Sequence, residues 1–386
     1  MEDRYMHVMH LIDSMHGGGA ETSILEVAPT LTKRGIRTSI VTLFPDDESL
    51  EDRLEALGLT RIRLKHRDPL GLTLELRNLI CSERPDLLHT TLLFANLIGR
   101  IVGRTVRLPV VTTLANQDYG PEHRTNSHYG AWSVRAVHAA DMLTVPLTTR
   151  FHAISENVAR VMSRRLRIPK DRIQVVYRGR DPERLGAPSL DRRLKTRAAL
   201  SIDAKAPVVL SVGRLDRQKG VDTTIDAFGH LTKRMPDAIL LIAGRPGNAS
   251  AEVQAKARGY PAIRLLGHRT DVPDLMCAAD VLSFPSRWEG LGGTLVEAMA
   301  LRLAIVASDI PPLVETIGDV GWPLVRPDDG QALAEGLGSL LRPGAENDLR
   351  KTAGESRFRE FFTAEAAADG MAGLYRNVLH ATRPSQ

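Results

Sequence analysis

Residues 280–309 read "DVLSFPSRWEGLGGTLVEAMALRLAIVASD": a short apolar run, a glycine-rich turn, a helical stretch and a second apolar run. The runs "VLSF" and "AIVAS" have the length and the aliphatic content of buried strands. The stretch "TLVEAMALR" between them consists mostly of good helix formers. A strand, a helix and a strand in this order predict a βαβ unit with two parallel strands. This stretch therefore indicates the α/β class.

The same alternation extends in both directions along the chain. In the second half, "PVVLSVGR" and "AILLIAGR" flank the amphipathic stretch "DTTIDAFGHLTKRM". In the first half, "HVMHLID", "TSIVTLF", "DLLHTTL" and "PVVTTLA" alternate with stretches such as "ETSILEVAPTLTKRG". A chain of 386 residues has the length of two domains. We therefore predict two doubly wound domains, each around a parallel sheet.

The remaining segments set the expected domain boundaries. Residues 181–206 are polar and rich in charge, which predicts a linker between a domain at 1–180 and a second domain at 207–355. Residues 356–386 read as a helical tail, with apolar side chains available for packing at Phe358, Phe361, Phe362 and Leu374.

Composition narrows the class of protein. The chain has 43% hydrophobic and 25% charged residues and a formal net charge of +5, which favours anionic partners. Aromatic residues make up 4%, and no nucleic-acid-binding motif is present, so we expect no nucleic acid partner. The sequence shows no apolar run of about 18 residues and no signal peptide, which predicts a cytoplasmic protein. Cys81 and Cys277 are expected to be buried thiols, without a disulfide or zinc site.

Basic residues follow the expected strand "PVVLSVG". In an open α/β sheet, ligands bind beyond the carboxyl ends of the strands. The loop "RLDRQKG" places Arg214 and Lys219 there. The planar fork of arginine and the point charge of lysine suit the oxygens of a diphosphate. A solvated basic loop is the alternative interpretation of these two residues.

Two acids flank the glycines that follow the expected strand "DVLSFP". Gly290, Gly292 and Gly293 allow a ligand to approach the backbone, and the helix that follows offers free N–H groups and a positive dipole end. Glu289 precedes this helix and Glu297 lies within it. The pair suits a ligand with hydroxyl groups at both ends and negative charge in the middle. Each acid alone fits an ordinary surface helix equally well.

The motifs, taken in order, resemble a known family. "VGRLDRQKG", "AGRPG", "LLGHRTDVPDLMCAADVLSFPSRWEGLGGTLVEAMA" and "IVASDIPPLVE" run through most of residues 208–316. They are similar to the donor domain of the retaining GT-B glycosyltransferases of family 4, with the E-x7-E signature. The resemblance implies GT-B architecture, in which two doubly wound Rossmann-like domains face a central cleft, with the tail packing back toward the N-terminal domain.

The resemblance also implies roles for single residues. It assigns Arg214 and Lys219 to the donor diphosphate, Glu289 to the transferred sugar and Glu297 to the ribose. We expect these donor-binding positions as well: Gly213, Gly290, Leu291, Gly292, Gly293 and Thr294, with Gly267, His268 and Arg269 near the nucleobase. The family more often has a bulkier apolar residue at position 293, so the glycine here predicts a looser backbone.

The first half supplies a second set of candidates. "HLIDSMHGGGAETSILE" is a strand, a glycine loop and a helix, but it lacks the G-x-G-x-x-G spacing of a dinucleotide site. The resemblance turns this loop toward the cleft, with Gly18 and Gly19 near the donor and His16 as a weaker candidate. Family members often carry a histidine after the strand equivalent to "PVVTTLA". Here the sequence is "ANQD", so Asn116, Asp118 or neither takes that role. We interpret His89 as structural.

The resemblance implies transfer of a hexose-like unit from a nucleotide sugar to a hydroxyl acceptor, with retention of configuration and without a metal or other cofactor. We expect a place in bacterial cell-surface polysaccharide, lipopolysaccharide or glycolipid synthesis. The alternatives are a nucleotide-sugar epimerase of GT-B architecture, a catalytically silent nucleotide-sugar-binding protein and a membrane-associated scaffold.

Residues 158–172 are strongly basic. Docking on an anionic membrane at the inner face of the plasma membrane would bring the chain to a lipid-linked acceptor. A solvated helix face fits the segment equally well. Its basic residues are Arg160, Arg164, Arg165, Arg167, Lys170 and Arg172.

Overall fold

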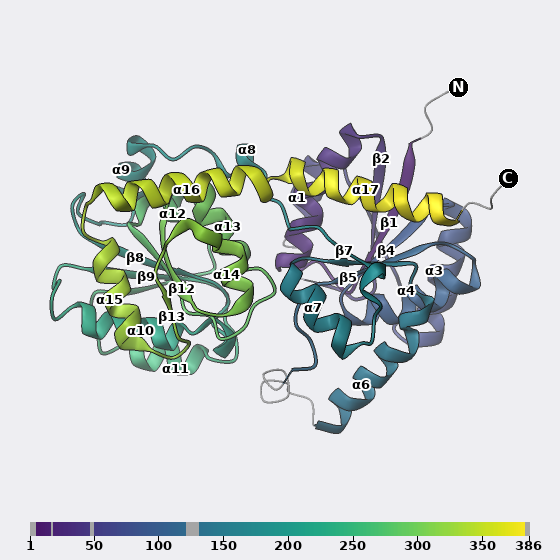
Figure 1. Ribbon diagram of the computed structural model, residues 1–386, viewed down its shortest axis with the longest axis horizontal. Coiled ribbons are helices and arrows are strands. Elements are labelled where there is room, and N and C mark those ends of the chain that lie inside the picture. The colour runs from purple at the N-terminus through teal and green to yellow at the C-terminus, as the bar shows by residue number, and fades with distance from the viewer. Residues whose placement is uncertain (1–4, 17, 47–49, 121–130, 383–386) are drawn as a thin grey trace. The chain divides into compact units, whose positions relative to one another are not determined.

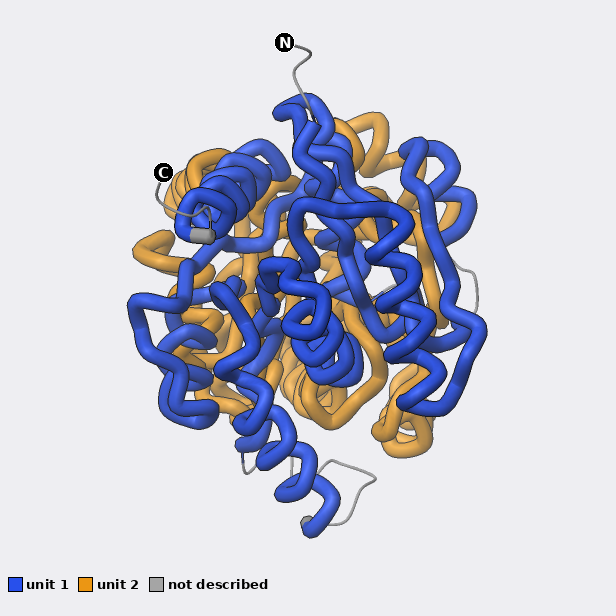
Figure 2. The backbone as a smooth tube through the Cα atoms, turned by 90° about the vertical axis from the view of Figure 1, so that its right-hand side faces the viewer, with its two compact units in different colours: residues 1–181, 363–386 blue, residues 182–362 orange. Residues whose placement is uncertain are grey.

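The computed structural model describes residues 5–16, 18–46, 50–120 and 131–382, and the chain forms two units (Figure 2). Unit 1 comprises Met1–Asp181 and Thr363–Gln386, and unit 2 comprises Pro182–Phe362. The chain therefore enters unit 2 once and returns to unit 1 for its last helix.

Within the described residues, unit 1 contains a seven-stranded sheet in the order β3-β2-β1-β4-β5-β6-β7 (Figure 1). Every neighbouring pair is parallel. The strands are mostly aliphatic and β-branched, as expected where helices cover both faces. They are β1 (Met6–Ile12), β2 (Ile36–Thr42), β3 (Thr60–Arg63), β4 (Leu87–Thr91), β5 (Val110–Leu114), β6 (Arg150–Ala153) and β7 (Ile173–Val175).

Among the described residues, three apolar clusters pack the helices of unit 1 on this sheet, and the smallest joins α1 and α2 to β1 and β2. Of the two larger clusters, one joins α1 and α17 to the strands, and the other joins α3 and α4 to them. Capping residues fix where several of these helices begin. For example, the Asp68 side chain accepts from the Gly71 amide at 2.7 Å, and Pro69 is the first residue of α3. The helices are α1 (Gly19–Lys33), α2 (Glu51–Ala56), α3 (Pro69–Glu83), α4 (Leu93–Thr105), α6 (Ala131–Thr144), η1 (Val145–Leu147), α7 (Glu156–Arg165), η2 (Lys170–Arg172) and α17 (Ala364–Thr382).

Within the described chain, unit 2 contains a six-stranded sheet in the order β10-β9-β8-β11-β12-β13, again parallel throughout. The strands are β8 (Val208–Val212), β9 (Ile239–Ala243), β10 (Ile263–Gly267), β11 (Val281–Phe284), β12 (Ala304–Ser308) and β13 (Leu324–Val325). The longer helices are α9 (Leu190–Ala199), α10 (Val221–Leu231), α11 (Ser250–Ala257), α13 (Gly293–Ala300), α15 (Gly330–Leu340) and α16 (Ala345–Phe361), and the shorter ones are α8 (Pro182–Leu185), η3 (Arg217–Lys219), α12 (Val272–Ala278), α14 (Pro311–Ile317) and η4 (Gly318–Val320). The predicted α/β class with two doubly wound domains is confirmed.

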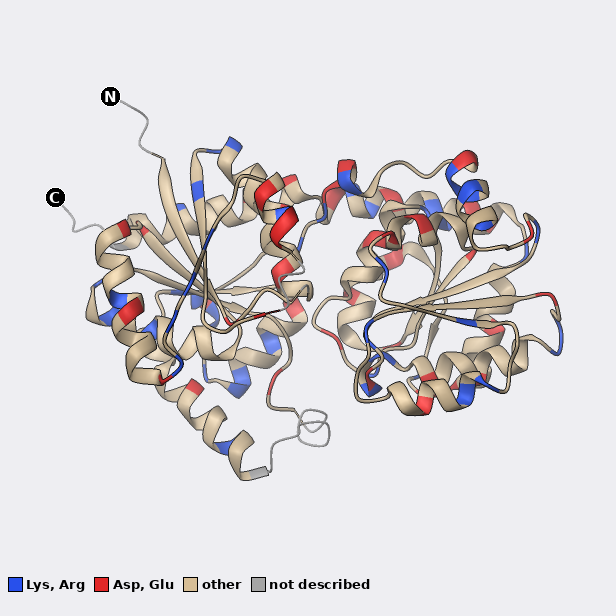
Figure 3. Ribbon diagram, turned by 180° about the vertical axis from the view of Figure 1, so that it is seen from behind, with Lys and Arg blue, Asp and Glu red and all other residues tan. Residues whose placement is uncertain are grey.

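Residues 181–206 differ from the expected linker, because α8 and α9 form there as part of unit 2. Arg197 of α9 is 1% exposed, and its guanidinium donates to the carbonyls of Ala278, Asp203, Ala204 and Ala206 and pairs with Asp280 at 2.9 Å. The charge that predicted a solvated linker is therefore neutralised inside the unit. Acidic and basic residues are spread over the elements of both units (Figure 3).

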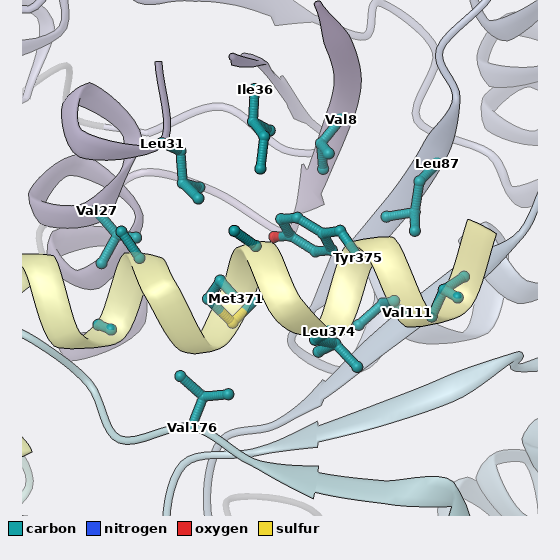
Figure 4. Close-up of a cluster of buried hydrophobic side chains, with 14 residues drawn as sticks. Val8, Val27, Leu31, Ile36, Leu87, Val111, Val176, Met371, Leu374 and Tyr375 are labelled. Atoms are coloured by element: carbon teal, nitrogen blue, oxygen red, sulfur yellow. The ribbon is translucent and has the colours of Figure 1, made fainter. Parts of the chain in front are cut away.

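The C-terminal stretch also differs from the expected single tail. Helix α16 belongs to unit 2 and ends at Phe361, whereas α17 begins at Ala364 and belongs to unit 1. The turn between them is fixed in unit 1, where the Ala364 amide donates to the Arg180 carbonyl at 2.9 Å. Leu374 and Tyr375 of α17 are buried against the sheet (Figure 4). Of the two thiols expected to be buried, Cys277 is buried, but Cys81 is exposed because it lies on the solvent side of α3.

A polar group is buried on the face of the unit 1 sheet that α1 and α17 cover. His10 of β1, His89 of β4 and His152 of β6 are each less than 9% exposed, and the hydroxyl of Tyr375 lies 2.7 Å from Nδ1 of His89. Burial lowers the pKa of His10 to about 3 and that of His152 to about 4, and burial with the neighbouring histidines holds the pKa of His89 well below its usual value. All three rings are therefore neutral near pH 7.

Replacing Arg197 with Met should lower the free energy of unfolding of unit 2 by about 3–5 kcal/mol, because the carbonyls and Asp280 lose a buried partner. The control is Lys195→Met on the exposed side of the same helix. This change should alter the free energy of unfolding of unit 2 by less than about 0.5 kcal/mol. Urea denaturation followed by tryptophan fluorescence measures both, since Trp288 and Trp322 lie in unit 2. Equal effects of the two variants would show that residues 181–206 act as a linker.

Unit 1 should lose stability as the pH falls from 6.5 toward 5. The unfolded histidines take up protons in this window and the folded ones do not, so each buried histidine costs about 1.4 kcal/mol per pH unit. One group opposes this: burial raises the pKa of Asp13 to about 6, so its folded form takes up a proton first. These three histidines against one carboxyl leave a net loss of about 3 kcal/mol per pH unit below pH 6, and His7, whose pKa burial also lowers, adds to this loss.

Pulsed hydrogen exchange in urea at each pH, resolved by peptide, measures this loss in unit 1. Unit 2 is the internal control, because its His230 and His268 are exposed. A stability of unit 1 that stays flat between pH 7 and pH 5 would contradict the neutral histidine group.

Candidate functional site

The loops of unit 2 that carry the predicted donor residues meet at one edge of the sheet. β8 and β11 are hydrogen-bonded neighbours, with Val281 opposite Val209 and Leu282 opposite Leu210. The chain leaves β8 toward β9 on one side, and β11 leads to β12 on the other. This is the topological switch point at which open α/β sheets bind ligands.

The two loops are joined to each other by backbone contacts. The Arg287 amide donates to the Gln218 carbonyl at 2.8 Å, and the Gln218 side chain donates to the Trp288 carbonyl at 2.9 Å. Gly220 has φ of 62°, and a Cβ there would lie 2.2 Å from the Pro285 carbonyl oxygen. Only glycine allows this approach.

Arg287 ties the loops to the rest of unit 2. Its guanidinium pairs with Asp222 at 2.7 Å and with Asp328 at 2.6 Å. Burial alone would raise the pKa of Asp222, but the hydrogen bond and charge of Arg287 lower it. Sequence analysis missed this arginine. Its only signal was a basic residue inside the motif "PSRWEG".

Lys219 and Glu289 form the centre of the site. The ammonium of Lys219 lies 2.5 Å from Oε1 of Glu289 and 5.5 Å above the ring of Phe284. Ser286 donates to the same carboxylate oxygen at 3.0 Å, and Glu289 is only 6% exposed. A buried carboxylate and a partly buried cation are thus held side by side, 70 residues apart in the chain.

Helix α13 begins immediately after the glycines. Gly292 precedes it in the left-handed conformation, with φ of 88° and ψ of 62°. The first amides of a helix have no partner within it and point out of its N-terminus. Glu297 lies on the same half-buried face as Gly293 and Thr294, four and three residues away. Glu289 lies before the helix and Glu297 on its second turn, as the sequence predicted.

Arg214 lies in the loop after β8 and differs from Lys219 in exposure. Its side chain is 63% exposed and pairs with Asp216, which also accepts from the Asn248 amide at 2.9 Å. Asp216 therefore orients the arginine, a role that sequence analysis did not assign. Gly213, at the end of β8, has φ of 154°, and the stem of Lys219 passes 3.4 Å from where its Cβ would be.

The residues predicted near the nucleobase lie at the end of the edge strand β10. Gly267 ends the strand and His268 is exposed. Arg269 binds Asp271 through two hydrogen bonds of 2.8 and 2.5 Å. Because β9 lies between β10 and β8 in the sheet, the structure does not bring these three residues to the Lys219–Glu289 pair.

The candidates of unit 1 lie at the carboxyl ends of its own strands. His16, Gly18 and Gly19 follow β1, and Gly17 between them lies outside the described residues. Asp13 of the same loop accepts from the Ala95 amide at 2.7 Å, and burial raises its pKa to about 6. Sequence analysis missed this carboxyl.

The segment after β5 is fixed by its backbone. Asn116 accepts from the Gln117 amide at 2.9 Å, and the Asp118 carbonyl accepts from Arg165 at 2.7 Å. The side chains of Asn116 and Asp118 are half-buried, so both stay candidates for the sugar contact. His89, interpreted as structural, lies in the buried group described above.

The basic segment divides into two kinds of residue. Arg165 and Arg172 donate to backbone carbonyls of unit 1. The others are exposed: Arg160, Arg164, Arg167 and Lys170. In the described part of the chain, no helix is long and apolar enough to cross a membrane, and no group of three or more His, Cys, Asp or Glu side chains could hold a metal ion.

Comparison with known families divides the chain at nearly the same place. Residues 17–184 match the model described as Glycosyltransferase Family 4, and residues 206–343 match the model described as Glycosyl transferases group 1. The chain is 28% identical over 300 residues to the alpha-D-kanosaminyltransferase of Streptomyces kanamyceticus, covering 73% of each protein.

A second curated relative is the lipopolysaccharide core biosynthesis mannosyltransferase LpsB of Rhizobium meliloti. It is 27% identical over 215 residues, which are 53% of this chain and 61% of that protein. Among solved structures, HepE of Anabaena in complex with UDP and glucose superposes with a TM-score of 0.84 at 20% identity, over 96% of this chain and 100% of that one. This similarity shows that the fold is shared.

Proposed function

The chain belongs to the group 1, family 4 glycosyltransferases, which transfer sugar from a nucleotide sugar, and we propose that it transfers a hexose from a nucleoside diphosphate sugar to a hydroxyl group with retention of configuration. The observation that carries the proposal is the contact of Lys219 with Glu289 at the switch point of unit 2. It joins one group suited to phosphate and one suited to a sugar hydroxyl.

The diphosphate would bind to the cationic side of this pair. Lys219 and Arg214 supply the positive charge, and the first amides of α13 supply hydrogen-bond donors. As the bond to the anomeric carbon breaks, negative charge grows on the departing diphosphate. Fixed donors aimed at that charge stabilise the transition state more than the ground state.

Glu289 and Glu297 would bind the two ends of the donor. The Glu289 carboxylate accepts from Ser286 and Lys219, and a carboxylate is the type of acceptor that a sugar hydroxyl would donate to. When the diphosphate draws the Lys219 ammonium away, Glu289 becomes a stronger hydrogen-bond acceptor for the sugar hydroxyl. Glu297, one turn into α13, would accept from the ribose hydroxyls.

The donor and the acceptor class belong to this proposal. UDP-sugars are the first donors to test, because HepE of the same fold binds UDP and glucose. A lipid-linked acceptor in surface-polysaccharide or lipopolysaccharide synthesis is supported by the likeness to LpsB and by the exposed residues Arg160, Arg164 and Arg167. The likeness to the 2-deoxystreptamine glucosyltransferase of Streptomyces kanamyceticus, 27% identical over 394 residues, favours a second candidate, a soluble amino-cyclitol acceptor.

The test is a thermal-shift screen of UDP, GDP and ADP with their sugars, followed by product analysis with the sugar that stabilises the chain. Transfer with an α-linked product from an α-linked donor, unchanged by a chelator, supports retaining, metal-free transfer. Inversion of the linkage or loss of turnover with the chelator would refute those parts. Isomerised sugar without an acceptor would indicate an epimerase instead.

Lys219→Ala and Arg214→Ala should each lower the turnover number by roughly a hundredfold or more, by analogy with removal of one oxyanion donor. Arg217→Ala is the matched control, because it removes one positive charge from an exposed residue of the same loop. Steady-state transfer kinetics measure all three. If Lys219→Ala and Arg214→Ala keep the rate of Arg217→Ala, the diphosphate assignment is wrong.

Glu297→Ala should weaken binding of the nucleoside diphosphate by about tenfold or more, because a carboxylate hydrogen bond contributes about 1.5–3 kcal/mol. Titration calorimetry with the free diphosphate separates this effect from catalysis. Glu335→Ala, an exposed acid on α15, controls for the change in net charge. Unchanged affinity in Glu297→Ala would remove this residue from the ribose.

A further inference from the structure

Helix α6 of unit 1 turns an apolar side toward solvent. Trp132 and Leu143 are 81% and 79% exposed, and Ala136 and Ala139 between them are exposed as well. Steps of four, three and four residues place these four side chains in one line along the helix. A surface helix normally does the reverse, with its apolar side on the core and its charged side in water. The described part of the chain leaves this apolar line uncovered.

Helix α4 adds exposed apolar side chains beside α6. Phe94 and Ile101, two turns apart on α4, are both exposed. The two helices pack against each other, and the steps from β4 to β5 and from β5 to β6 run in the same direction across the sheet. Right-handed connections therefore place α4 and α6 on the same face of the sheet. We call this surface the docking face; its members are Phe94, Ile101, Trp132, Ala136, Ala139 and Leu143.

The exposed charges around the docking face have one sign. Among the described residues of α4 and α6, the one acidic side chain is Asp141, which is buried and pairs with Arg100 at 2.5 Å. Arg104 and Arg135 are exposed, and the guanidinium of Arg135 lies 5.5 Å from the centre of the Trp132 ring. Figure 3 shows α6 mostly without charged residues. Apolar side chains next to exposed cations, with no exposed acid, suit an anionic partner.

Helix α7 continues the positive charge in the same layer of helices. The connection from β6 to β7 has the same direction as the two before it, so α7 lies on the same face of the sheet as α6. Nε2 of His138 in α6 donates to the Arg165 carbonyl at 2.9 Å, where α7 ends. Arg160, Arg164 and Arg167 are exposed. Exposed cations thus extend over three neighbouring helices.

We propose that the docking face binds the surface of an anionic lipid bilayer, with Trp132 and Leu143 inserted among the lipid headgroups and the first acyl carbons. Tryptophan is enriched at this depth of a membrane, and arginines beside it keep their charges among the headgroups. A second copy of the chain fits less well, because contact between two such faces would bring arginines together without acids. An acidic groove of a protein would take one helix, whereas an anionic bilayer matches cations spread over α4, α6 and α7.

The docking face deepens the proposed function and rests on its lipid-linked acceptor, because a substrate held in a membrane gives membrane docking its use. Vesicle binding is measured without donor or acceptor, so the two proposals fail separately. A chain that binds vesicles but transfers no sugar supports the docking face and refutes the proposed function. A chain that transfers sugar but ignores anionic vesicles refutes the docking face alone.

The test floats the full-length protein with vesicles of phosphatidylcholine alone and with vesicles of phosphatidylcholine and phosphatidylglycerol in equal parts. We expect binding to the mixed vesicles and binding weaker by roughly tenfold or more to phosphatidylcholine alone. Mixed vesicles with brominated acyl chains should quench part of the tryptophan fluorescence. Trp132→Phe should remove this quenching, because Trp288 and Trp322 lie in unit 2, outside the docking face.

Trp132→Ser combined with Leu143→Ser should weaken binding to the mixed vesicles by roughly tenfold or more, because both apolar side chains lose their burial in the bilayer. Leu190→Ser combined with Leu349→Ser is the matched control, since it removes two exposed leucines of unit 2 and should change binding by less than about twofold. All four side chains are exposed, so the folded core keeps its contacts.

Four results would overturn the proposal. They are no binding to the mixed vesicles, binding without quenching of Trp132, equal effects of the two double variants, and a dimer in sedimentation that Trp132→Ser dissociates. Binding without quenching would mean that the arginines attract the bilayer while α6 stays outside it. The wild-type flotation is read without any variant, so the first result is decisive even where a variant fails to fold.

Discussion

The parallel pairing of β8 with β11 is the constraint on which the candidate site depends. Two hydrogen-bonded residue pairs, Val209 with Val281 and Leu210 with Leu282, bring together strands that are separated by two βα units along the chain. Because parallel strands end at the same edge, their following loops must meet there. Lys219 and Glu289 are neighbours for this reason and not through any sequence proximity.

Charge in unit 2 is arranged in pairs and small networks around that edge. Arg287 links the β11 loop to Asp222 of α10, and Asp216 orients Arg214 in the β8 loop. These contacts fix the loops without using the Lys219–Glu289 pair itself. Under the proposed function, Lys219 and Glu289 can then exchange partners when a diphosphate arrives, while the loops that carry them stay in place.

Unit 1 places its polar groups differently, since it buries them. His10, His89 and His152 come from three strands on one face of the sheet, and Tyr375 comes from α17, the last helix of the chain. A row of neutral hydrogen-bonded rings is tolerable in a core only if nearly every donor and acceptor is matched. In this row, Nδ1 of His10 is buried and has no hydrogen-bond partner among the described protein groups.

The sequence alone determined the α/β class, two doubly wound domains, the family and the positions of Glu289 and Glu297 relative to α13, because strand and helix periodicity and glycine spacing are local properties. It misjudged residues 181–206, since charge density cannot show that Arg197 binds carbonyls and Asp280 inside unit 2. It also placed the start of the tail at residue 356, within α16, although the last helix does belong to unit 1 as expected. It could not find Arg287, Asp216 or Asp13, whose partners lie on other elements or in folded turns.

The sequence also could not predict the histidine group, because residues 10, 89, 152 and 375 come together only when the parallel sheet forms and α17 packs on it. Tertiary structure decided these features, since each depends on contacts between residues far apart in the chain.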